Sequence, residues 1–88
     1  MKPLNFAILK YFTKVDKAST AEVMATLSSE YGAFKAFTKK DILEALLTAE
    51  ANGLIEGVGS KFDEDNELLL YFRAHEEGKQ TINRYIHD

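Results

Sequence analysis

The sequence contains no cysteine and no tryptophan, has one proline, and has no long run of apolar residues. Without cysteine, the chain cannot form disulfides, a thiolate nucleophile or a cysteine-ligated zinc or iron–sulfur site. No stretch approaches the roughly 20 apolar residues of a membrane-spanning helix, and the first apolar run is too short for a signal peptide. We therefore expect a cytoplasmic protein that is stabilised by packing alone.

The 88 residues, of which 45% are hydrophobic and 28% charged, suffice for one compact core. The net charge of −3 is distributed unevenly, with +4 on residues 1–40 and −7 on residues 41–88. Proteins that bind nucleic acid usually carry a basic excess, which this chain has only in its first half. We predict a single domain that spans residues 1–88.

Apolar periodicity and capping signals predict four helices. Ser19, followed three residues later by Glu22, forms a capping box, and Thr38 is the start signal of the third helix. Asn52 and Gly53 are typical of a left-handed helix end. The predicted helices lie near residues 4–16, 20–31, 39–52 and 76–86.

Between residues 54 and 73 the helical period is absent. Gly57 and Gly59 indicate a bulge or a sharp twist, residues 63–66 have turn composition, and residues 67–73 are typical of a largely buried strand. This pattern predicts a β-hairpin near residues 54–73.

The apolar stripe of each helix predicts which residues form the core. We expect the most buried residues to include Leu27, Ile42, Leu46 and Ile82, because each lies at the centre of its stripe. On the last helix, Tyr85 is also expected to face the interior.

The order of these elements and two short runs resemble the winged helix-turn-helix superfamily. Residues 46–55, which end in Gly53-Leu54-Ile55, are similar to the junction between its recognition helix and its wing. Residues 70–79 are similar to the junction between the wing and the last helix, with His75 where Thr is frequent. The resemblance covers roughly residues 4–86. It implies an α+β, mostly α fold with three helices, a two-stranded β-hairpin wing and a C-terminal helix, and a transcriptional regulator in the style of PadR-like or MarR-like proteins.

In that superfamily the third helix enters the major groove of duplex DNA. Thr38, Lys39 and Lys40 lie at its N-terminal end, where backbone amides and the helix dipole favour a phosphate. Farther along the exposed face, Glu44 can accept a hydrogen bond from cytosine and Thr48 can contact a base edge. These five residues are the predicted DNA-binding residues. The alternative is that Lys39 and Lys40 are solvated residues of a first helical turn.

The hairpin tip and several apolar residues favour a different function. Residues 61–67 carry four acidic side chains and one basic, a charge that repels phosphate. Phe6, Leu9, Leu43 and Leu47 exceed what the inward helix faces require, which predicts a contact with another protein, most simply a homodimer. The alternative function is a winged-helix protein-interaction module that does not bind DNA.

No constellation of residues predicts an enzyme, a metal site or a cofactor. His75 and His87 have no obvious third ligand, and the alternating acids of residues 63–67 lack the glycine and the closing glutamate of a calcium loop. No serine gains a His–Asp partner by spacing. The expected partners are duplex DNA and a second copy of the chain, with no membrane and no metal.

Overall fold

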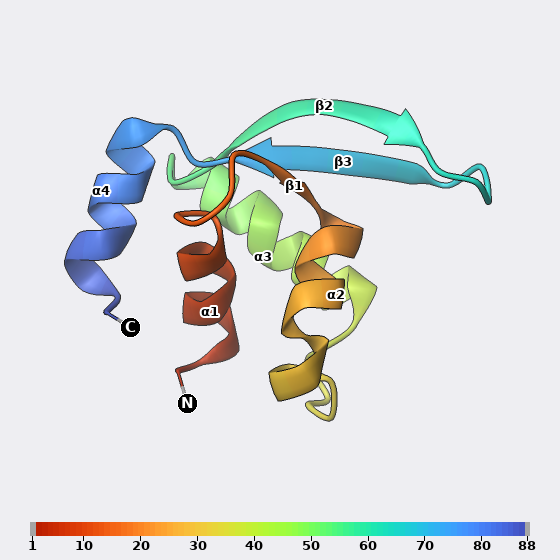
Figure 1. The fold of residues 1–88 in the computed structure, drawn as a ribbon, viewed down its shortest axis with the longest axis horizontal. Helices are drawn as coiled ribbons and strands as arrows, with labels where there is room; N and C mark the ends of the chain where they lie inside the picture. Colours follow the sequence, from red (N-terminus) through yellow and green to blue (C-terminus); the bar gives the residue numbers. More distant parts are fainter. Residues whose placement is uncertain (1, 88) are drawn as a thin grey trace.

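A computed structural model describes residues 2–87 and shows, within them, a small α+β fold of four helices and a three-stranded antiparallel sheet. The strand order in the sheet is β1-β3-β2. Figure 1 shows the elements in chain order. They are α1 (Leu4–Tyr11), β1 (Ala18–Ser19), α2 (Thr20–Tyr31), α3 (Lys39–Ala51), β2 (Glu56–Phe62), β3 (Leu68–Arg73) and α4 (Glu76–Tyr85).

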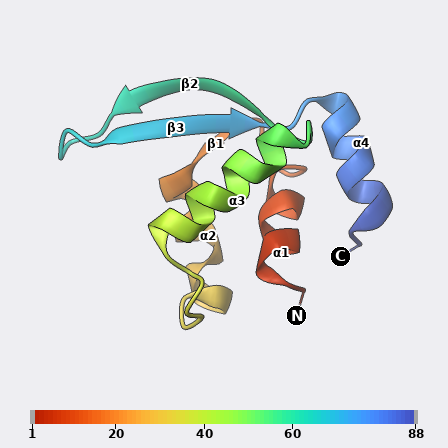
Figure 2. The same cartoon turned by 180° about the vertical axis from the view of Figure 1, so that it is seen from behind.

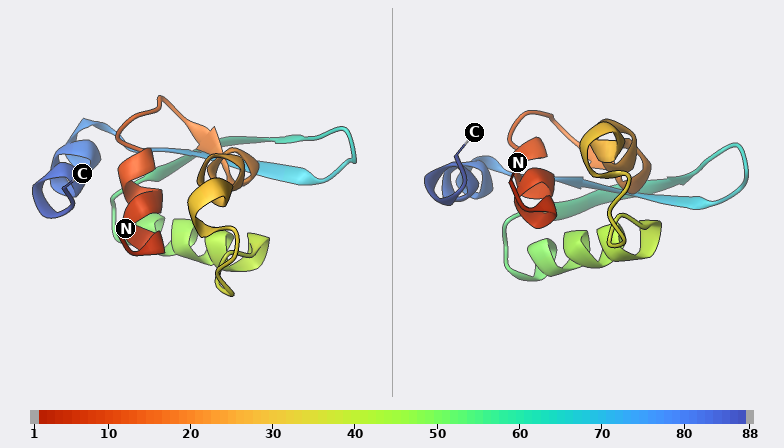
Figure 3. Two further views of the ribbon diagram at one scale, coloured as in Figure 1. Left: turned by 60° about the horizontal axis from the view of Figure 1, so that its bottom comes forward. Right: turned by 90° about the horizontal axis from the view of Figure 1, so that it is seen from below.

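The β2–β3 hairpin extends well beyond the helices, while α4 lies at the opposite end of the molecule (Figures 1 and 2). Viewed from below, α3 runs alongside the strands of the hairpin (Figure 3). The hairpin tip is therefore distant from the packed centre of the domain, to which α3 belongs.

The predicted hairpin is confirmed, including its irregularity. Antiparallel pairing runs from Glu56 opposite Arg73 to Phe62 opposite Leu68, and its register shifts between residues 57 and 59. Gly59 has a φ of 142°, a backbone conformation that side chains with a Cβ rarely adopt. The glycine thus permits the bulge that twists the exposed edge strand.

Two local features differ from the prediction. The strand β1 was not predicted, because two residues are too few to show alternation; Ala18 pairs with Phe72, and Ser19 pairs with Tyr71. The first helix ends at Tyr11 and not near residue 16. Single turns follow it, and the chain then bends so that β1 reaches the edge of the sheet.

The core lies where the helices meet the inner end of the sheet. Ile42, Leu46 and Ile82 are at most 2% exposed, as predicted. The prediction for Leu27 was wrong, because this side chain is only partly buried at the edge of the core. The prediction for Tyr85 was also wrong: it is 73% exposed. The buried positions along and just after α4 are residues 78, 82 and 86, so Ile86, and not Tyr85, continues the inward face beyond Ile82.

The helix starts follow the predicted chemistry. The Ser19 hydroxyl accepts a hydrogen bond from the amide of Glu22 (3.2 Å), and the Glu22 carboxylate accepts one from the amide of Ser19 (3.0 Å). Thr38 Oγ1 accepts from the amide three residues later (3.1 Å). His75 also caps its helix, since its Nδ1 accepts from the amide of Gly78 (3.2 Å). Each cap satisfies an amide that has no partner within its helix.

Candidate nucleic-acid and protein interface

The helix α3 presents one buried and one exposed stripe. Its inner stripe consists of Ile42, Leu46 and Ala49, which are buried. The predicted DNA-binding residues all lie on the exposed part of the helix or at its start. They are Thr38, Lys39, Lys40, Glu44 and Thr48. The N-terminal end of α3 points toward the hairpin tip (Figure 2), so that a ligand on this stripe also approaches the hairpin.

One of the two predicted phosphate-binding lysines already has an acidic partner. Lys39 Nζ donates a hydrogen bond to Glu67 Oε2 at 2.9 Å, and their side chains are 57% and 61% exposed. This hydrogen bond and the negative charge of Glu67 raise the pKa of Lys39 above its ordinary value of 10.5. The start of α3 is thereby linked to the hairpin. Residue spacing had not predicted this pair, because the two residues are 28 positions apart.

Thr48 lies on a different flank of α3 from Leu47. Thr48 lines a cavity of about 240 Å³ between α1 and α3, together with Asn5 and Leu9. Leu47 instead lines a shallow pocket of about 210 Å³ against the hairpin. The exposed stripe of α3 is therefore bordered by two hollows, one facing α1 and the other facing the hairpin.

The four predicted partner residues do not form one patch. Phe6 and Leu47 are 46% and 44% exposed but belong to α1 and α3 respectively. Leu9 and Leu43 are partly buried against the core. Further apolar residues lie on the hairpin; two of them, Leu68 and Leu70, belong to residues 67–73, which were predicted to form a largely buried strand.

These hairpin residues complete an apolar strip. Leu70 lines the same pocket as Leu47, Leu68 lies two residues before it on β3, and Phe62 is the register partner of Leu68. We call these four residues the α3–hairpin strip. Leu68 and Phe62 are 51% and 66% exposed. Their position near the free end of the hairpin could not be read from composition, which does not show where helix coverage of a strand ends.

The segment that carries α3 and the hairpin is acidic. Residues 39–73 hold four basic and eight acidic side chains, a net charge of −4. Arg73 Nε lies 3.6 Å from Glu56 Oε1. Lys61 lies over the ring of Tyr71, with Nζ 5.6 Å from the ring centroid. Lys40 is the other exposed cation at the start of α3.

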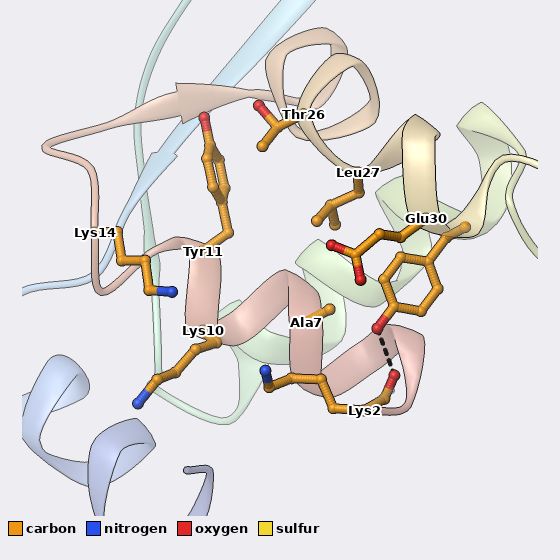
Figure 4. A pocket seen from close by; sticks show the side chains of 9 residues that line it. Lys2, Ala7, Lys10, Tyr11, Lys14, Thr26, Leu27 and Glu30 are labelled. Carbon is orange, nitrogen blue, oxygen red and sulfur yellow. Dashed lines mark hydrogen bonds between the residues drawn. The ribbon is translucent and has the colours of Figure 1, made fainter. Parts of the chain in front are cut away.

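A second pocket, of about 260 Å³, lies between α1 and α2 and is lined by three lysines (Figure 4). Lys10 is buried and donates hydrogen bonds from Nζ to Asn83 Oδ1 (2.6 Å) and to the carbonyl oxygen of Ile86 (3.0 Å). The Tyr31 hydroxyl donates to the carbonyl oxygen of Lys2. The Lys10 contacts attach α4 to α1, and the Tyr31 contact attaches the first residues of the chain to α2. These polar groups at the pocket therefore hold the fold together.

Among residues 2–87, no three acidic or histidine side chains are grouped so that they could hold a metal ion. No helix in the same range is long and apolar enough to cross a membrane. In comparisons with known proteins, no family model matches the chain and no curated protein matches it. Function is therefore inferred from the geometry and charge of the α3–hairpin face.

Proposed function

We propose that the chain is a winged helix-turn-helix domain and a regulator of transcription that binds double-stranded DNA, with α3 as the recognition helix and the β2–β3 hairpin as the wing. The observation that supports this proposal is the order of the elements: α2 and α3 precede an extended hairpin, and α4 follows it. The outer stripe of α3 is exposed over its whole length, as insertion into a major groove requires.

The N-terminal end of α3 is the part best suited to a phosphate. Its first amides and the positive end of the helix dipole lie beside Lys39 and Lys40. Lys39 has to exchange Glu67 for the phosphate. This exchange is easy, because both side chains are more than half exposed and water already screens the pair. Glu44 then faces base edges farther along the groove.

The charge of this face sets the expected affinity. Two lysines displace about two counterions, which gives a slope of about −2 for the logarithm of the binding constant against the logarithm of the salt concentration. The acidic hairpin tip lowers affinity further. We expect binding that is measurable at low salt and weak at moderate salt.

Fluorescence anisotropy with labelled duplexes tests the proposal. Lys39→Ala/Lys40→Ala should weaken binding to every sequence and remove about two units of salt slope. The control Lys79→Ala/Arg84→Ala removes the same charge from α4, at the far end of the molecule, and should change binding little. Replacing Asp63, Glu64 and Asp65 with their amides should strengthen binding. The proposal fails if no duplex binds at low salt, or if the α4 control loses as much affinity.

A further inference from the structure

The α3–hairpin strip (Leu47, Leu70, Leu68 and Phe62) is a continuous apolar surface. Leu47 and Leu70 meet in one shallow pocket, where α3 faces the hairpin. Successive side chains of a strand alternate between faces, so Leu68 lies on the same face of β3 as Leu70. Phe62 lies directly opposite Leu68 across the hairpin and shares its face. The strip thus continues from α3 toward the hairpin tip.

On the hairpin, exposure rises from Leu70, which is partly buried against the core, toward the outer end of the strip. Leu47 is 44% exposed, Leu68 51% and Phe62 66%. Single exposed apolar residues are ordinary on protein surfaces, whereas adjoining ones bordered by charge mark binding sites. Tyr85 on α4, at 73% exposed, is an example of a single exposed residue. The residues of the strip, in contrast, adjoin one another.

Most charges that border the strip are acidic; the exceptions are the lysines at the start of α3 and Lys61, whose ammonium group lies over the ring of Tyr71. Glu50 lines the pocket beside Leu47. Asp63, Glu64 and Asp65 form the turn that follows Phe62. Lys39 is occupied by Glu67. A ligand that covers the strip therefore gains free energy by bringing cations to this border.

We propose that the α3–hairpin strip binds a segment of another protein whose apolar side chains are flanked by lysine or arginine. Charge complementarity selects this occupant over a second copy of the chain, because a symmetric pairing would bring two segments with a net charge of −4 together. The inference does not depend on DNA binding. Since the segment covers one flank of α3, it competes with a duplex for this helix.

Three synthetic peptides test this inference by fluorescence anisotropy, with the full chain as the receptor. The first is an amphipathic helix of Leu and Lys, the second replaces Lys with Glu, and the third replaces Leu with Ser. The receptor variant Phe62→Thr/Leu68→Thr removes the exposed half of the strip at positions where Thr suits a strand. Tyr85→Thr is the matched control, because it removes an equally exposed ring from α4.

The Leu–Lys peptide should bind, and the other two should bind at least about tenfold more weakly. Phe62→Thr/Leu68→Thr should bind the Leu–Lys peptide about tenfold more weakly than the wild type does. Tyr85→Thr should bind it with unchanged affinity. Equal binding of the Ser–Lys peptide would mean that charge alone attracts it, and equal binding by the strip variant would place the contact elsewhere; either result overturns the inference. Self-association that Phe62→Thr/Leu68→Thr abolishes would assign the strip to a second copy and also overturn it.

The same variants separate this inference from the DNA proposal. Lys39→Ala/Lys40→Ala should lose affinity for the duplex and retain its affinity for the Leu–Lys peptide. If wild-type protein binds no duplex but discriminates among the three peptides, the DNA proposal fails while the docking surface stands.

Discussion

The two ends of β3 lie in different environments. At its C-terminal end, β3 is the central strand between β1 and β2, and Phe72 is 2% exposed. At its N-terminal end only β2 pairs with it, and Leu68 is 51% exposed. Every residue of β2 is exposed. Stability thus resides at one end of a single strand, and the surface available to a partner resides at the other.

This difference has a thermodynamic consequence. An isolated two-stranded hairpin is only marginally stable in water, so the outer hairpin depends on the core that holds its inner end. The hairpin can therefore open while the helices stay folded. The following predictions test how far the two regions are independent.

Leu46→Ala should have the largest effect, because Leu46 is completely buried on α3. We expect a loss of about 2–5 kcal/mol in the free energy of unfolding, enough to threaten so small a domain. Phe62→Ala, at a side chain 66% exposed, should cost less than about 1 kcal/mol. Urea denaturation followed by circular dichroism measures both. Similar losses would show that the hairpin belongs to the core.

Gly78→Ala should have the next largest effect on the free energy of unfolding. A Cβ on Gly78 would lie 2.3 Å from the carbonyl oxygen of Leu54, where α4 packs against the connection between α3 and β2. Replacing glycine with alanine inside a helix ordinarily stabilises a protein. Here we expect the opposite, a loss of about 2–3 kcal/mol in the free energy of unfolding, because the added Cβ has no space. Gln80→Ala, on the exposed side of the same helix, is the control and should change stability little. Stabilisation by Gly78→Ala would contradict this close approach.

The inner region was predictable from the sequence because its signals are local. Apolar spacing located Ile42, Leu46 and Ile82, and side-chain chemistry located the caps at Ser19 and Thr38. Local patterns do not show how elements pack. Leu27 lies on the apolar side of α2, but it lines the pocket between α1 and α2 and is therefore only partly buried.

The candidate interface was predictable only in part, because its main features join residues that are distant in the sequence. The exposed stripe of α3 follows from helical geometry, and so do Lys40 and Glu44 on it. The Lys39–Glu67 pair and the pocket that Leu47 and Leu70 line together depend on how the hairpin lies along α3. No spacing rule within either segment encodes that placement.

Gly59→Ala should loosen the hairpin without affecting the helices. The φ of 142° at Gly59 is strained for alanine, although a Cβ there would meet no atom within 4 Å. The expected cost is therefore conformational, about 1–2 kcal/mol. It should appear as faster hydrogen exchange of β2 and β3 amides, with exchange in α3 unchanged. Ser60→Ala, the next residue in β2, should leave both unchanged. Equal acceleration in α3 would show that the hairpin and the core open together.

Glu67→Gln should have the smallest effect, on the link between the hairpin and α3. Glu67 raises the pKa of Lys39 above 10.5, so the pair stabilises the fold at neutral pH and its contribution is lost as pH rises through that raised value. Glu67→Gln should move the Lys39 pKa back toward 10.5, measured by an NMR titration of the side chain. Glu64→Gln removes the same charge from the same turn but no hydrogen bond to Lys39, so it should move the pKa less. Equal shifts would mean that the general charge of the tip, and not a specific contact, holds the hairpin near α3. With the contact removed, Lys39 no longer has to leave an acidic partner, and duplex affinity at low salt should rise.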